Sequence, residues 1–134
     1  MATTSITTTK GVWLASLITA INVLIASGFS IAGLVSPQSV LPASYVPTES
    51  SALFAMYAAA RTVPLALITL AAIYYRATAA LLILGTLAGV VQLLDAGIGL
   101  FQHDAGKSAG PFVIAAIQFS VVLLLNRSTR RPRL

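Results

Sequence analysis

The chain lacks cysteine, has few charged residues and is especially poor in acids. None of its 134 residues is cysteine, which excludes disulfides, thiol catalysis and cysteine-bound metals. Only 8% of the residues are charged, against roughly 25% in soluble domains. In their place 57% of the residues are hydrophobic, and the mean hydropathy is +0.93. A soluble domain would have to bury nearly all of this material in one core, so the composition favours a membrane protein.

Long uncharged segments predict membrane-spanning helices. No charge occurs between Lys10 and Glu49, and about 20 apolar residues are enough to cross a bilayer. We therefore expect an all-α, integral membrane four-helix bundle that forms a single domain. Its spans are expected over 12–35, 51–75, 78–101 and 111–125, followed by a basic tail over 126–134. Pro64 is expected to bend the second span, because proline removes one helical hydrogen bond.

The basic residues predict the orientation of the bundle. One side of the predicted topology carries only Lys107, and the other collects Lys10, Arg76, Arg127, Arg130, Arg131 and Arg133. The positive-inside rule then places both termini in the cytoplasm, whether the membrane is a plasma, inner or endomembrane. A cleaved signal peptide ending near Ala32 is an alternative, although the apolar run exceeds the usual length of about 7–15 residues.

The basic tail is expected to touch membrane lipid headgroups and not nucleic acid. Arginines directly after a span are typical topology determinants and attract anionic lipid. No base-stacking aromatic residues accompany them, so we expect no nucleic-acid partner.

Two opposite charges lie inside the predicted spans. Asp95 is the only acid of the third segment and Arg61 the only base of the second. Lone charges are costly in lipid, so we expect the two to pair, and intramembrane ionisable residues are candidates for a functional site. A rise of about 1.5 Å per residue puts Arg61 about 15 Å and Asp95 about 9 Å from the outer ends of their spans, a gap that arginine can close. The pair either acts directly, as candidate catalytic residues, or only locks the bundle.

Other polar and aromatic residues are expected near this pair. The candidate ligand-binding residues are Tyr57, Gln92, Gln118, Asn22 and Phe54. Gln118 is predicted about 10 Å from the outer end of its span. Apolar walls with a few polar groups suit a small apolar ligand. For the three amides, hydrogen bonding between helices is the favoured interpretation, and Gly85 and Gly89 allow helices to approach closely.

Two short motifs resemble a known family. The second span contains YAAARTVPLA over 57–66, and the third contains QLLDA over 92–96. Through them the chain resembles the DoxX-like small four-span membrane proteins. The resemblance implies a compact four-helix bundle with both termini inside, in which Arg61 and Asp95 match the buried polar pair of the family. Pro64 departs from the small or aliphatic residues more usual there. Some relatives are labelled as accessory subunits.

Three classes of function follow from these features. The first is a buried polar site in the outer half of the bundle that binds or transforms a small apolar molecule. The second is an accessory or assembly subunit with a structural Arg61–Asp95 lock. The third is a small proton-coupled transporter. Exposed aliphatic faces also allow homo-oligomers. We expect no cofactor and no metal, because His103 and the scattered acids do not supply three or four convergent ligands.

Overall fold

The protein is an antiparallel bundle of long helices. The computed structural model describes residues 3–42 and 44–130, and within them the elements are α1 (Thr3–Val35), a short 3-10 turn η1 (Pro37–Ser39), α2 (Glu49–Tyr74), α3 (Thr78–Phe101) and α4 (Ala105–Arg130). Four of these helices are long and apolar enough to cross a membrane, which confirms the all-α prediction. Residues 131–134 of the predicted basic tail lie outside the described residues.

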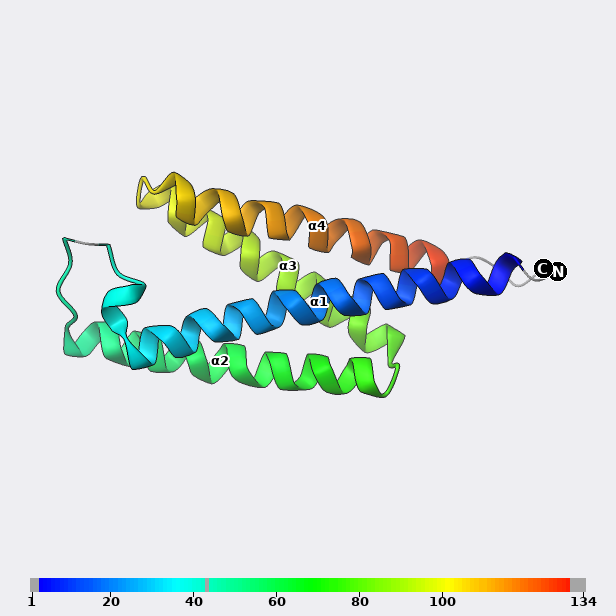
Figure 1. Cartoon of the computed structure of the whole chain (residues 1–134), viewed down its shortest axis with the longest axis horizontal. Helices are drawn as coiled ribbons and strands as arrows, with labels where there is room; N and C mark the ends of the chain where they lie inside the picture. Colours follow the sequence, from blue (N-terminus) through cyan, green and yellow to red (C-terminus); the bar gives the residue numbers. More distant parts are fainter. Residues whose placement is uncertain (1–2, 43, 131–134) are drawn as a thin grey trace.

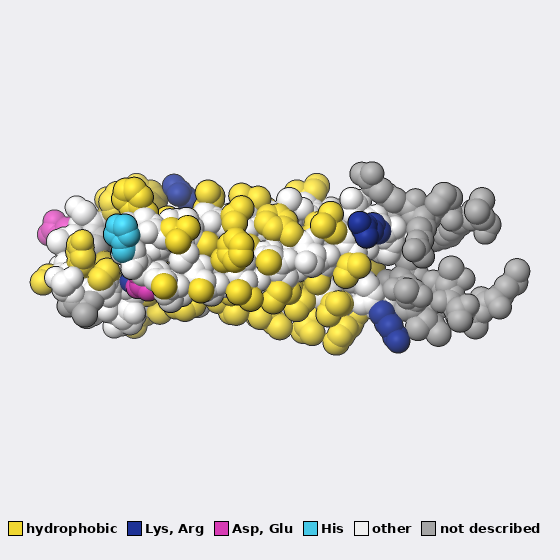
Figure 2. All heavy atoms as spheres, turned by 90° about the horizontal axis from the view of Figure 1, so that it is seen from above, with side chains coloured by type: hydrophobic (Ala, Val, Ile, Leu, Met, Phe, Trp, Pro, Cys, Tyr) yellow, Lys and Arg dark blue, Asp and Glu magenta, His cyan; other side chains and the backbone are white. Residues whose placement is uncertain are grey.

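Two ends of the bundle can be told apart by charge. The start of α1, the end of α4 and the α2–α3 turn lie together at the end drawn on the right (Figure 1). We call it the basic end, because Lys10, Arg76 and Arg127 lie there. The opposite end, which holds the α1–α2 loop and the α3–α4 turn, is the loop end. Figure 2 shows hydrophobic side chains along the middle of one face between these ends, as a membrane-spanning bundle requires.

α2 begins at a complete cap and continues through its proline. The Thr48 hydroxyl accepts a hydrogen bond from the Ser51 amide at 3.2 Å, and the Ser51 hydroxyl accepts one from the Thr48 amide at 2.9 Å. This reciprocal capping box satisfies amides that have no partner within the helix. Glu49 in the first turn also suits the positive end of the helix dipole. Pro64 lies inside α2, which continues to Tyr74.

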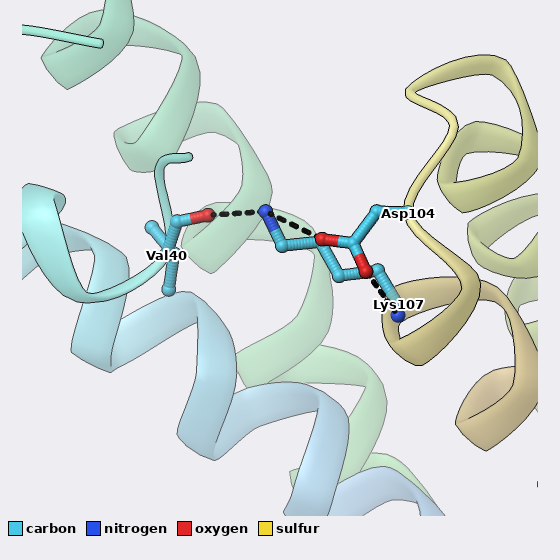
Figure 3. A network of polar contacts seen from close by, with 3 residues as sticks. All are labelled: Val40, Asp104 and Lys107. Carbon is cyan, nitrogen blue, oxygen red and sulfur yellow. Dashed lines mark hydrogen bonds and ion pairs between the residues drawn. The ribbon is translucent and has the colours of Figure 1, made fainter. Parts of the chain in front are cut away.

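α4 begins earlier than the sequence predicts, at Ala105 and not at residue 111. The cause is Asp104, whose Oδ1 accepts a hydrogen bond from the Lys107 amide at 3.1 Å and so caps the helix. The Lys107 ammonium lies 3.7 Å from Asp104 Oδ2 and donates to the Val40 carbonyl at 3.4 Å (Figure 3). These contacts tie the first loop to the start of α4.

The earlier start of α4 changes the depth of Gln118. Gln118 is 13 residues beyond Ala105, about 20 Å at 1.5 Å per residue, so it lies near the middle of α4 and not about 10 Å from its end.

Helix packing is uneven across the bundle. α3 lies closely along α4, and α1 packs on both α2 and α4. α2 and α3 are joined by a short turn at the basic end and diverge toward the loop end (Figure 1), so they share far fewer contacts. Among the glycines the tightest approach is at Gly99, where an added Cβ would lie 2.6 Å from the backbone of Lys107 and Ser108. Only glycine permits this distance between two helix backbones.

Candidate functional site

A layer of amide side chains crosses the middle of the bundle. Gln92 on α3 donates to Asn22 on α1 at 2.7 Å, and Asn22 donates to Gln118 on α4 at 3.1 Å. Gln118 then donates to the Thr19 hydroxyl at 2.9 Å. All four side chains are buried, and Gln118 is completely inaccessible. This amide layer consists of Thr19, Asn22, Gln92 and Gln118 and joins three helices.

Glycines on α3 make room for this layer. A Cβ added at Gly85 would lie 3.0 Å from the Gln118 amide nitrogen and 3.4 Å from the Thr19 hydroxyl. At Gly89 it would lie 3.0 Å from the ring of Phe119. The four-residue spacing of small residues therefore brings α3 close enough to α4 for Gln118 to reach α1. The hydrogen bonds between helices that the sequence predicts for the three amides are present.

Arg61 and Asp95 do not form the expected pair. Both side chains are exposed on the surface of the bundle. Within the described residues neither makes an ion pair or a hydrogen bond, and Lys107–Asp104 is the only ion pair there. The expectation of a buried lock is corrected by the helix packing, because α2 and α3 separate between their turn and the loop end, with Arg61 halfway along α2 and Asp95 farther toward the loop end on α3. Sequence spacing gives depth and face but not the angle between two helices.

By helical periodicity the two charges lie on adjoining sides of α2 and α3. Leu65 on α2 packs against a buried cluster that includes Ala66 and Ala88, and Ala88 is on α3. Arg61 is four residues before Leu65 and Asp95 is seven after Ala88, so each lies on the same helical face as that contact. We call the strip beyond this contact, toward the loop end, the α2–α3 face. It carries one positive and one negative side chain.

The aromatic candidates lie near Arg61 on the outside of α2. Tyr57 is four residues before Arg61 and is 54% exposed, and Phe54 is seven before it and 71% exposed. They share the helical face of Arg61 and form no enclosed wall in the described part of the chain. The structure therefore brings together Asn22, Gln92 and Gln118, while Arg61, Asp95 and the two aromatic residues lie at the surface.

Two buried threonines were missed by sequence reasoning. Thr19 accepts the last hydrogen bond of the amide layer, and its spacing of three residues from Asn22 is a signal that could have found it. Thr69 on α2 is fully buried, and its hydroxyl oxygen has no hydrogen-bond partner among the described residues. No group of three His, Asp or Glu side chains in the described ranges could hold a metal ion.

Comparison with known proteins adds nothing to this geometry. No family model, no curated protein and no solved structure matches the chain. The resemblance to DoxX-like proteins stays a prediction.

Proposed function

We propose that this chain is a membrane subunit that works by association, and that its partner at the α2–α3 face is a second copy of itself. The observation that carries the proposal is the exposure of Arg61 and Asp95 on membrane-spanning helices without a partner in the described chain. A charge facing lipid near the bilayer centre is unfavourable by about 2.5–3.5 kcal/mol on insertion scales. Contact with an opposite charge on another subunit removes much of that penalty.

A second copy has the required complementarity. In a dimer with a two-fold axis along the membrane normal, Arg61 of each copy faces Asp95 of the other, and both pairs form together. The two residues must then lie at similar depth. Arg61 is 13 residues before Tyr74 and Asp95 is 17 after Thr78, which gives about 20 and 26 Å from the shared α2–α3 turn at 1.5 Å per residue. The arginine side chain is long enough to cover the difference of about 6 Å.

The proposal includes the orientation of the bundle. Lys10, Arg76 and Arg127 lie at the basic end, and Lys107 is the one basic residue of the described loop end outside the spans. This distribution favours a cytoplasmic basic end, with both termini inside the cell. Arg61 then lies near the middle of the bilayer and Asp95 in its outer half.

The amide layer favours association over ligand binding or transport. The three amide side chains of this layer already form hydrogen bonds with one another and with Thr19, so they do not need a ligand to satisfy them. Asp95 lies outside this layer, and no hydrogen bond connects it to a polar path through the bundle in the described structure. A proton-coupled transporter would need such a path.

Mixing two defective variants tests the proposal. The chains Arg61→Ala and Asp95→Ala are each prepared with two different affinity tags and co-purified from membranes. Neither variant can form an Arg61–Asp95 pair with itself, so each should lose self-association. A mixture of the two can form one such pair across the interface and should recover co-purification. Thr62→Ala, a change at the neighbouring position, is the matched control and should associate like the wild type.

An intramolecular pair predicts a different pattern. Mixing would then restore nothing, because each chain would still lack one member of its own pair. Full co-purification of either single variant would also contradict the proposal, since no reciprocal pair would be needed.

A further inference from the structure

A second surface feature lies at the basic end, away from the α2–α3 face. It is a groove of about 490 Å³ between α1, the α2–α3 turn and the start of α3. The lining is largely apolar, with Val12 and Trp13 on one wall and Leu81 on another. Arg76 lies at its edge, and Ser16 and Thr78 add two hydroxyls. We infer that this groove binds one anionic phospholipid, with the phosphate on Arg76 and an acyl chain along the apolar lining.

The charge of the groove points to an anionic partner. Within the described residues the Arg76 guanidinium makes no ion pair and no hydrogen bond. The chain has three acids, and all of them belong to the loop half: Glu49 begins α2, Asp104 precedes α4, and Asp95 is six residues from the end of α3. None of these three carboxylates therefore serves as the counter-ion of Arg76. A lipid phosphate without a cationic group in its headgroup meets that need better than a zwitterionic lipid.

The apolar lining points to a lipid and not to a soluble phosphate. Trp13 is 64% exposed and lies three residues after Lys10, at the level where tryptophan marks the boundary between headgroups and acyl chains. Val12, Ile73 and Leu81 also line the groove, and their apolar side chains offer nothing to a free anion. An acyl chain covers such a surface, while its phosphate stays at the depth of Arg76.

Arg76 also has an unusual backbone conformation, which makes a clean test variant available. Arg76 follows the last residues of α2 with a φ of 53°, the left-handed conformation that favours glycine. The Arg76 amide donates to the Ile73 carbonyl at 3.0 Å, and the Ala77 amide donates to the Ala72 carbonyl at 2.8 Å. These two hydrogen bonds form the Schellman motif, in which glycine usually occupies the position of Arg76. Glycine adopts this positive φ with less steric strain than arginine does. Arg76→Gly therefore removes the guanidinium without disturbing the turn.

Trp13 provides the measurement, because it is the only tryptophan of the chain. The full chain is placed in phosphatidylcholine vesicles that contain a small fraction of brominated phosphatidylglycerol or, separately, brominated phosphatidylcholine. Bromine on the acyl chain quenches tryptophan on contact. The wild type should be quenched by the anionic lipid at about fivefold lower mole fraction, the preference expected from one basic residue at an anionic surface.

Three variants separate the groove from general surface charge. Arg76→Gln and Arg76→Gly should both lose the preference, so that the two brominated lipids quench equally. Arg127→Gln removes an exposed arginine of the same end on α4, outside the groove, and should keep it. Circular dichroism should show unchanged helix content in all three variants.

Several results would overturn the inference. Equal quenching of the wild type by both lipids would remove the anionic preference. An equal loss in Arg127→Gln would mean diffuse attraction to the membrane surface. Relief of quenching by millimolar glycerol phosphate would assign the site to a free phosphate. None of these outcomes depends on Arg61 or Asp95, so the groove can fail while self-association holds, and the reverse.

Discussion

Replacing Gly99 by alanine tests the helix packing that holds the bundle together. The new Cβ would lie 2.6 Å from the Lys107 carbonyl carbon and the Ser108 amide nitrogen, both backbone atoms of α4. Ordinary contact begins near 3.4 Å, so α4 must move by about 0.8 Å. The Ser108 hydroxyl also donates to the Ala96 carbonyl across this contact at 3.1 Å, and the movement weakens that hydrogen bond.

The magnitude follows from three opposing effects. Forcing a methyl group into a packed contact is unfavourable by about 1–3 kcal/mol. Weakening one hydrogen bond between membrane helices adds about 0.6 kcal/mol. Removing a helical glycine returns up to about 1 kcal/mol of helix propensity. The free energy of unfolding should therefore fall by about 0.6–2.6 kcal/mol, because the steric effect and the weakened hydrogen bond together exceed the gain in propensity.

Gly97 is the matched control for this change. It is two residues away on the same helix, and an added Cβ would meet nothing within 4 Å. Gly97→Ala should be neutral or stabilising by up to about 1 kcal/mol. Both variants are compared by reversible unfolding in mixed micelles, with helix content followed by circular dichroism. The close approach of α3 and α4 would be refuted if Gly99→Ala were as stable as Gly97→Ala.

Two further pairs of variants test the buried and capping polar groups. Thr69→Val removes a buried hydroxyl without a described partner and should raise the free energy of unfolding by about 1 kcal/mol, whereas Thr19→Val removes the acceptor of Gln118 and should lower it by about 1 kcal/mol. The same sign for both threonines in a micelle unfolding assay would contradict the hydrogen-bond assignments. Asp104→Ala should lower stability by about 1 kcal/mol through loss of the α4 cap. Lys107→Ala keeps that cap, because the capped group is a backbone amide, and should have an effect of under about 0.5 kcal/mol; equal effects would mean that the exposed ion pair matters more than the cap.

The helices could be predicted from the sequence because apolar runs long enough to cross a membrane have few alternatives to a helix. Apolar runs of this length have to satisfy their backbone groups internally, so each becomes a helix. The start of α4 could not be placed, because Gly106, Ser108 and Gly110 look like a loop and Pro111 like a helix start. Asp104 fixes the first residue of α4 through a single capping hydrogen bond. Such a bond depends on the local backbone path, which periodicity does not contain.

The candidate site was predictable only in part, for a related reason. The hydrogen bonds of Asn22, Gln92 and Gln118 follow from a simple rule, since amides inside a membrane bundle must find one another. The relation of Arg61 to Asp95 depends instead on how far α2 and α3 diverge. α3 lies close to α4 through its glycine contacts, whereas α2 packs mainly on α1. These contacts draw the two helices to different neighbours.

The most direct test of the central claim is energy transfer between labelled chains in dilute liposomes. The chain has no cysteine, so one cysteine introduced at Ser44, in the α1–α2 loop, carries a donor or an acceptor dye on separate preparations. The wild type should show energy transfer that persists on dilution with lipid. Arg61→Asp and Asp95→Arg should each abolish it, and the double reversal should restore it. Energy transfer that is unchanged in both single reversals would contradict association through the α2–α3 face.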